Sequence, residues 1–248
     1  VGGPPRRHHP VPTEARNWAG GRRTWEHADV RVHRSFAFVD VSGFTALTEL
    51  EGDERAVDVL TAFRALLRDI CSRRGVRIVK WLGDGVMLVC VDTRPLLETI
   101  LELHYVVGEV GAVETVSIRS GLTEGDVILM EGDDYVGHCV NVASRLCDLA
   151  AAGEALAAPA VMGDLPNWGE VLSETHVTLR GVEKPVPASS IRIARSDTDA
   201  SHDPICGLPL TEDTAQEIAH DVRGSMVLFC SPGCVDTWRR RPARSLSG

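Results

Sequence analysis

Residues 76–91, VRIVKWLGDGVMLVCV, are two apolar, β-branched runs on either side of Gly83, Asp84 and Gly85. Glycines tolerate the positive φ of tight turns, so the pattern predicts a β-hairpin. The hairpin carries Lys80 and Asp84, although neither charge is needed to make the turn. These two side chains are therefore candidates for a function.

The segments around the hairpin alternate between strand and helix patterns. SFAFVDVSG (residues 35–43) predicts a strand that ends near Asp40, and apolar residues at helical spacing follow it as far as Gly75. Further elements are expected at residues 95–103 (helix), 116–130 (two strand pieces) and 141–153 (helix). The order strand, helix, two strands, helix, strand is that of the ferredoxin-like (βαββαβ) fold. We therefore expect an α+β domain, to which residues 176–194 add edge strands.

Composition limits the class of protein. The chain has 248 residues, 44% of them hydrophobic, and a formal net charge of −9. Proteins that bind nucleic acid or membrane surfaces usually carry a basic excess, and no stretch reaches the roughly 18 apolar residues of a membrane span. We therefore expect no nucleic-acid partner, no membrane partner and a cytoplasmic location. Four of the seven cysteines lie in apolar periodic segments, so a disulfide framework is not expected.

Changes in composition suggest four regions. Residues 1–33 are rich in Pro, Gly, Arg and His and predict a disordered arm. The main domain is expected over residues 34–195 and a polar linker over residues 196–202. Residues 203–244 contain the last three cysteines and are expected to form a small C-terminal module.

Asp40 and Asp84 are the acidic candidates. Asp40 lies two residues before SGFT (residues 42–45), which opens a helix whose backbone amides can hold phosphate oxygens. In the predicted topology the first strand and the hairpin are neighbours, so the two carboxylates converge. Two hard oxygen ligands suit Mg²⁺ or Mn²⁺. Each aspartate alone is more typical of a solvated strand end.

A second polar cluster is DDYVGHCVNVASR, residues 133–145. On a helix, Asn141 and Arg145 lie one turn apart on one face. Arg offers a planar fork suited to phosphate, and Asn offers an amide that can orient a ribose oxygen. The alternative is the ordinary polar face of a surface helix.

Three motifs resemble the class III adenylyl and guanylyl cyclase catalytic domain in sequence, order and spacing: FVDVSGFT (38–45), KWLGDG (80–85) and DDYVGHCVNVASRL (133–146). LRGVEKPV (179–186) resembles that family's closing segment, and the resemblance covers about residues 34–195. The resemblance implies a set of functional residues, position by position: Asp40, Val41 and Asp84 for two Mg²⁺ or Mn²⁺ ions, Phe44, Thr45, Lys80 and Asp134 for the substrate, and Asn141 and Arg145 for the transition state.

The resemblance also implies that the active site forms between the two chains of a homodimer, so that Lys80 and Asp84 serve opposite sites. Lys80 and Asp134 match the residues that select the purine. Lys can only donate a hydrogen bond and ionised Asp can only accept one, which fits adenine rather than guanine. The implied activity is an adenylate cyclase that converts ATP into 3′,5′-cyclic AMP and pyrophosphate by two-metal catalysis. The alternative is a nucleotide-binding regulatory domain without turnover, coupled to a metal-sensing module.

The C-terminal segments DPICGLPL (203–210) and VLFCSPGCVDTW (227–238) resemble the YHS or TRASH type of small metal-binding module. Their thiols belong to Cys206, Cys230 and Cys234. Three thiolates favour Zn²⁺ or copper. The candidates for a fourth ligand are Asp203, His202, His220 and water. We expect metal binding that modulates the cyclase; the alternative is a set of reduced structural cysteines without metal.

Overall fold

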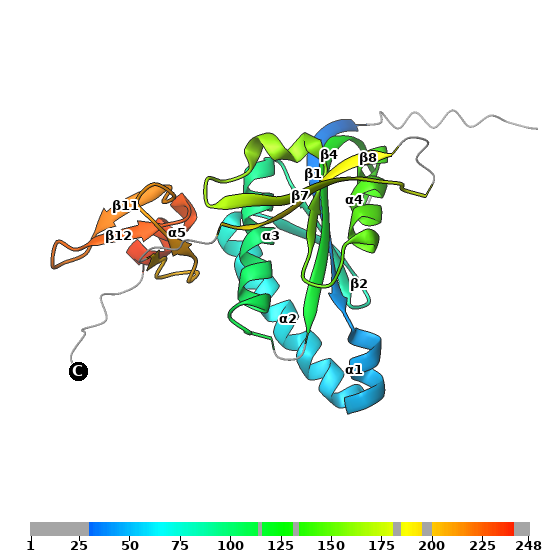
Figure 1. The fold of residues 1–248 in the computed structure, drawn as a ribbon, viewed down its shortest axis with the longest axis horizontal. Coiled ribbons are helices and arrows are strands. Elements are labelled where there is room, and N and C mark those ends of the chain that lie inside the picture. Colours follow the sequence, from blue (N-terminus) through cyan, green and yellow to red (C-terminus); the bar gives the residue numbers. More distant parts are fainter. Residues whose placement is uncertain (1–29, 114–115, 131–133, 181–184, 195–199, 241–248) are drawn as a thin grey trace, which may run out of the picture.

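The structure is a computed structural model that describes residues 30–113, 116–130, 134–180, 185–194 and 200–240 (Figure 1). A mixed sheet covered by helices forms the larger part, and a small C-terminal module lies beside it. The helices of the larger part are α1 (Phe44–Glu51), α2 (Asp53–Arg74), α3 (Thr93–Gly108), α4 (His138–Leu149) and the 3₁₀ helix η1 (Pro159–Asp164). Within these ranges, no helix has the length and apolar character needed to cross a membrane.

The sheet is eight-stranded, with its main strands in the order β2-β3-β1-β4-β6-β8-β7 and with β5 paired to β4. The bounds of its strands are β1 (Val30–Ser42), β2 (Arg77–Leu82), β3 (Gly85–Cys90), β4 (Ser117–Met130), β5 (Asp134–Val136), β6 (Ala155–Ala157), β7 (Gly169–Val177) and β8 (Val186–Ile193). β1 lies between β3 and β4 and is antiparallel to both. The predicted hairpin is formed by β2 and β3, with Gly83 at a φ of 70°. The ferredoxin-like prediction is therefore confirmed, and β7 and β8 extend the sheet.

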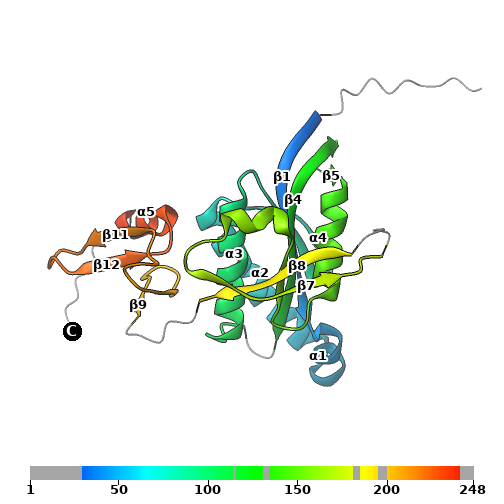
Figure 2. The same ribbon diagram turned by 45° about the horizontal axis from the view of Figure 1, so that its top comes forward.

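The two faces of β1 contact different helices. Ala37 and Val39 belong to the main core, to which α2 and α3 contribute fully buried side chains such as Phe63. Phe36 points to the opposite face, where its ring lies 5.3 Å from that of Tyr135 beneath α4. Figure 2 shows α4 on one side of the strands and α2 and α3 on the other. Because side chains alternate along a strand, Asp40 shares the α4 face with Phe36.

Two strands differ from the sequence prediction. β1 begins at Val30, inside the expected arm, because residues 30–33 pair with residues 126–129 of β4; residues 1–29 lie outside the described residues. β4 is one long strand rather than two pieces. Its glycines do not mark a turn, because Gly121 and Gly125 allow α4 to pack closely: a Cβ on Gly121 would lie 2.2 Å from the Ala143 carbonyl oxygen. Helix α4 also ends at Leu149 rather than near residue 153, since the backbone of residue 150 is extended.

The C-terminal module contains β9 (Ser201–His202), β10 (Pro209–Leu210), β11 (Glu217–His220), β12 (Met226–Phe229) and α5 (Pro232–Arg240). β9 pairs with β10 and β11 pairs with β12. Residues 201–202, expected in the linker, thus belong to a strand, whereas residues 195–199 and 241–248 lie outside the described residues. The buried side chains of Leu208 and Phe229 join the main core instead of forming a separate one.

Candidate active site and thiol cluster

Asp40 and Asp84 line one pocket. Asp40 lies near the end of β1, Asp84 lies at the tip of the β2–β3 hairpin, and the start of α1 closes the pocket of about 530 Å³. The hairpin tip packs closely on the end of β1, since a Cβ on Gly85 would lie 3.3 Å from Oδ1 of Asp40. The fold therefore brings the two carboxylates to one pocket, as the sequence predicted.

The pocket has the donor set of a divalent cation site. It offers two carboxylates, and Val41, whose side chain is buried in the main core, can offer its backbone carbonyl. Ser42 Oγ, at the same pocket, is buried without a hydrogen-bond partner among the described residues. Phe44 and Thr45 line the pocket at the N-terminal end of α1, where free amides favour anions. The residues fit a hydrated Mg²⁺ or Mn²⁺ ion with a phosphate ligand.

Charges in the pocket are only partly balanced. Arg119 of β4 donates two hydrogen bonds to Oδ2 of Asp40, from Nε at 2.9 Å and from Nη2 at 2.6 Å. Burial raises the pKa of Asp84, and the negative charge of Asp40 raises it further, while a backbone hydrogen bond and Arg119 oppose the shift. Asp84 is therefore the carboxylate that gains most from a cation in the pocket.

Arg119 was not singled out by the sequence analysis. It lies in an apolar strand, directly opposite Asp40 in the β1–β4 register. The sequence held one signal that could have identified Arg119, namely a charged residue within an apolar strand. Its partner could not be named before the register of the two strands was known.

Lys80 and Asp134 come together in the same chain. Nζ of Lys80 lies 2.9 Å from Oδ1 of Asp134, and the two side chains are 43% and 51% exposed. The hydrogen bond from Lys80 lowers the pKa of Asp134, and the backbone amide of Tyr135 adds to the effect. The pair is thus an accessible donor and acceptor set.

Asn141 and Arg145 lie one turn apart on α4 and are exposed, whereas Val142 and Leu146 of the same helix are buried. Arg145 Nη1 lies 3.4 Å from Oδ2 of Asp148. Within the described residues, the pocket of Asp40 and Asp84 is not lined by Lys80, Asp134, Asn141 or Arg145. Within the described part of one chain, these four residues therefore lie outside the pocket that the two acids line.

Residues 31–185 match the family described as the adenylate and guanylate cyclase catalytic domain. The chain belongs to this family. The pH-sensitive adenylate cyclase MT1302 of Mycobacterium tuberculosis is 36% identical to it over 162 residues, which are 64% of this chain and 40% of that protein. The uncharacterized protein Rv2212 of the same species is 38% identical over 152 residues, 61% of this chain and 39% of that protein. The chain thus spans about two fifths of the length of these relatives.

The fold of the cyclase domain is also that of a solved structure. The crystal structure of the adenylyl cyclase CyaB from P. aeruginosa superposes with a TM-score of 0.58 at 23% sequence identity. The match covers 68% of this chain and 98% of that chain. The cyclase fold is therefore confirmed, and the described part of the C-terminal module lies beyond the matched family segment.

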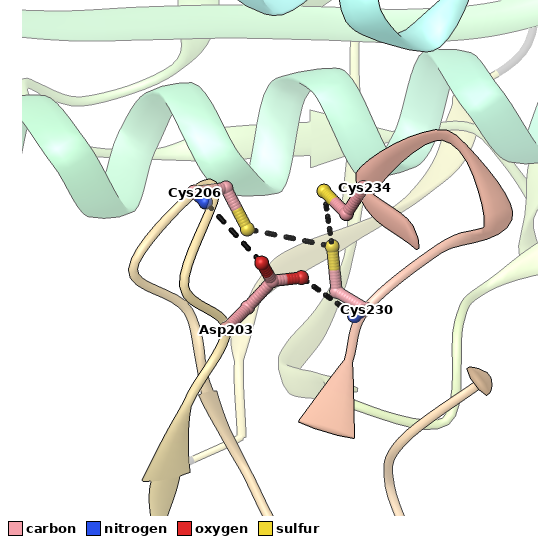
Figure 3. A group of neighbouring side chains, drawn as sticks. All are labelled: Asp203, Cys206, Cys230 and Cys234. Carbon is pink, nitrogen blue, oxygen red and sulfur yellow. Dashed lines mark hydrogen bonds between the residues drawn. The ribbon is translucent and has the colours of Figure 1, made fainter. Parts of the chain in front are cut away.

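The three C-terminal cysteines lie together in the module (Figure 3). Sγ of Cys230 lies 3.4 Å from Sγ of Cys206 and 3.6 Å from Sγ of Cys234. Asp203 completes the group, and the four ligand atoms all lie within 4.8 Å of one another. Of the other side chains considered as a fourth ligand, His202 and His220 do not join this group of described residues. The seven cysteines, all among the described residues, form no disulfide bond in the structure.

Hydrogen bonds connect the three thiols. Hydrogen bonds from Cys206 and Cys230 lower the pKa of Cys234, and sharing with Cys230 raises the pKa of Cys206. The carboxylate of Asp203 accepts hydrogen bonds from the amides of Ile205 and Cys230, each at 2.8 Å. It thereby fixes the two loops that carry the thiols. Such a preformed set of soft donors fits Zn²⁺ or copper.

Proposed function

We propose that the chain is an adenylate cyclase whose active sites form between the two chains of a homodimer. The observation that supports this most is the division of the matched residues. Asp40 and Asp84 share one pocket beside a helix start, whereas the described part of a single chain keeps Lys80, Asp134 and Arg145 out of it. A second chain related by a two-fold axis would supply the missing set, and each dimer would have two equivalent sites.

In this proposal Asp40, Asp84 and the carbonyl of Val41 hold two Mg²⁺ or Mn²⁺ ions. When bound, the ions would lower the pKa of the ribose 3′-hydroxyl and neutralise charge on the triphosphate. The backbone amides of Phe44 and Thr45 bind phosphate oxygens at the start of α1. These residues hold ATP on one chain.

The second chain supplies the groups that act during bond exchange. The 3′-oxygen forms a bond to the α-phosphorus while the bond to the bridging oxygen breaks, pyrophosphate leaves, and the hydroxyl proton passes to solvent. Arg145 offsets the negative charge on the phosphoryl oxygens, and Asn141 orients the ribose. Both side chains are exposed on α4 and accessible to a partner.

Lys80 and Asp134 select the base. Lys80 donates a hydrogen bond to the ring nitrogen of adenine, and Asp134 accepts one from its amino group. Guanine would place a donor against Lys80 and an acceptor against Asp134. Each unsatisfied group costs about 1–3 kcal/mol, so a preference for ATP of at least about tenfold is expected.

Product analysis tests this function. The full-length chain is incubated with ATP or GTP and with Mn²⁺ or Mg²⁺, and cyclic nucleotides are quantified by mass. We expect cyclic AMP with at least about tenfold less cyclic GMP from the native chain, no product from Asp40→Ala, and a smaller preference for ATP from Lys80→Met. The absence of any product from a folded, dimeric chain would instead support a regulatory nucleotide-binding domain.

We propose further that the C-terminal module is a metal-binding unit of the YHS or TRASH type that modulates the cyclase. Support comes from the three thiols of Cys206, Cys230 and Cys234, which lie within reach of one ion. Elemental analysis of the purified chain should find one Zn²⁺ or copper ion per chain, and a variant with all three cysteines changed to serine should contain none. Equal metal content in the two proteins would contradict this assignment.

A further inference from the structure

Arg74 of the cyclase domain contacts the thiol cluster of the module. Its Nη2 donates a hydrogen bond to Sγ of Cys230 at 3.2 Å. Its other nitrogens bind two acidic residues of α3, with Nε 2.6 Å from Glu102 and Nη1 2.8 Å from Glu98. The Arg74 side chain is only 2% exposed. A buried guanidinium is therefore shared between two carboxylates and one sulfur.

The position of Cys230 against Arg74 is fixed by the contact between the two parts of the chain. The indole nitrogen of Trp168 donates a hydrogen bond to the Cys230 carbonyl at 3.3 Å. Gly233 approaches the end of α2 so closely that a Cβ there would lie 2.7 Å from the Arg73 carbonyl oxygen. Gln216 of the module donates a hydrogen bond to Glu98 at 2.6 Å. The Arg74–Cys230 contact thus belongs to a packed interface.

The negative charge of a metal-loaded thiol cluster is complementary to the positive charge of Arg74. When three thiols lose their protons and take up a divalent ion, the net charge of the cluster falls by one; with a monovalent ion it falls by two. Arg74 can only donate hydrogen bonds, so it stabilises a thiolate better than a thiol. The carboxylates of Glu98 and Glu102 form ion pairs with three arginines, Arg74, Arg73 and Arg94, which leaves one positive charge in excess. That charge offsets one excess negative charge of the cluster but not a second. The surroundings therefore favour a thiophilic divalent ion.

We infer that Arg74 is a positioning residue of the proposed metal site, and that the site spans the boundary between the module and the cyclase domain and takes a thiophilic divalent cation such as Zn²⁺. The inference rests on the proposed metal binding by Cys206, Cys230 and Cys234. By linkage, the ion that gains affinity from Arg74 also strengthens the docking of the module on α2 and α3.

Zinc affinity of the full chain tests the inference. Competition with a chromophoric chelator, under reducing and anaerobic conditions, compares the native chain with Arg74→Gln/Glu102→Gln, which removes one positive and one negative charge together. Loss of a group that orients a metal ligand typically costs 10–100-fold in metal affinity, and a loss of about that size is expected. Glu102→Gln alone is the matched control and should bind Zn²⁺ at least as tightly as the native chain.

Two further measurements separate positioning from folding. Arg74→Lys keeps the charge and should recover part of the affinity. In Co²⁺-loaded protein, the sulfur-to-cobalt absorption per bound ion should be unchanged in every variant, since all three thiolates remain, and circular dichroism in the presence of chelator reports whether each variant is folded. If the double variant is misfolded, the comparison of Arg74→Lys with the native chain decides: equal affinity would overturn the role of the guanidinium.

The outcomes distinguish the two proposals. Equal Zn²⁺ affinity of the native chain and the folded double variant would overturn the role of Arg74 and leave the metal site standing. A native chain that binds Cu⁺ but fails to bind Zn²⁺ in this competition would overturn the divalent assignment. Failure of the native chain to bind any of these ions better than the triple serine variant would overturn the metal site itself.

Discussion

Arg119 and Asp40 face each other across the β1–β4 register, and the guanidinium donates both Nε and Nη2 to one carboxylate oxygen of Asp40. The two side chains are 32% and 26% exposed. Without nucleotide, Arg119 thus occupies one side of a carboxylate proposed to hold a divalent ion. Arg119 and the proposed ion would then compete for this carboxylate.

Replacing Arg119 with Gln should therefore tighten Mn²⁺ binding in the absence of nucleotide. A partly exposed ion pair contributes up to about 1 kcal/mol, which corresponds to an increase in affinity of about fivefold. Titration of free Mn²⁺ by electron paramagnetic resonance measures the change. Arg192→Gln, which removes a similar exposed ion pair with Glu170, is the control. Weaker Mn²⁺ binding by the Arg119 variant would contradict the competition.

Asp84→Asn should raise the melting temperature of the metal-free protein at pH 7. Burial raises the pKa of Asp84, so the fold favours the protonated carboxyl relative to the carboxylate. Its favourable contribution is complete below the unfolded pKa of about 3.9 and is lost as the pH rises through the folded value. The advantage of the neutral amide should therefore vanish at pH 3.5. Thermal melts at both pH values in chelator, with Asp148→Asn as an exposed control, decide the sign; a lower melting temperature at pH 7 would refute the prediction.

Mixing two inactive variants should restore activity if the sites are shared. Asp40→Ala damages the acidic half of each site, and Arg145→Ala damages the other half. In a heterodimer, one site receives both lesions and the other receives neither. Random assortment of equal amounts then gives about one quarter of native activity, measured as cyclic AMP formed by the refolded or coexpressed mixture. Activity no higher than that of either variant alone would rule out the shared site.

Gly121→Ala should destabilise the cyclase domain and its active site together. The added Cβ would lie 2.2 Å from both the Ala143 carbonyl oxygen and the Cys147 amide nitrogen, so α4 must move away from β4. Overpacking of this kind costs about 3 kcal/mol, measurable by urea denaturation. The cyclase activity should fall as well, because α4 carries Asn141. Gly108→Ala, where a Cβ meets no atom within 4 Å, is the matched control; equal stability of the two variants would contradict the close contact.

Local patterns predicted the elements that bring the two acids together. The alternation around Asp40 and the turn at Asp84 each depend on a few neighbouring residues, and the ferredoxin-like topology then makes β1 and β3 neighbours. The roles of these acids, like those of Lys80, Asp134 and Arg145, are still predictions. The two strand pieces expected over residues 116–130 were wrong, because β4 is one strand in which the missing side chain of Gly121 makes room for a helix.

Contacts between residues far apart in the chain could not be predicted from the sequence. The helical pattern was expected to run as far as Gly75, and α2 does end there, with Gly75 at a φ of 69°. In the structure Arg74 also donates hydrogen bonds to Glu98, Glu102 and Cys230. These partners come from distant segments, and no periodicity or local propensity encodes which distant side chains will meet.

The contact of Gly233 with the end of α2 sets a condition for protein engineering. Grafting residues 200–240 onto another cyclase would transfer the three thiols, yet a recipient would also need an arginine at the end of its second helix and a pair of acids one turn apart on the next. It would further need a tryptophan able to reach the Cys230 carbonyl. In a chimera that lacks these features, the module would not pack against the cyclase domain. Only recipients with matching residues at these positions would bind it.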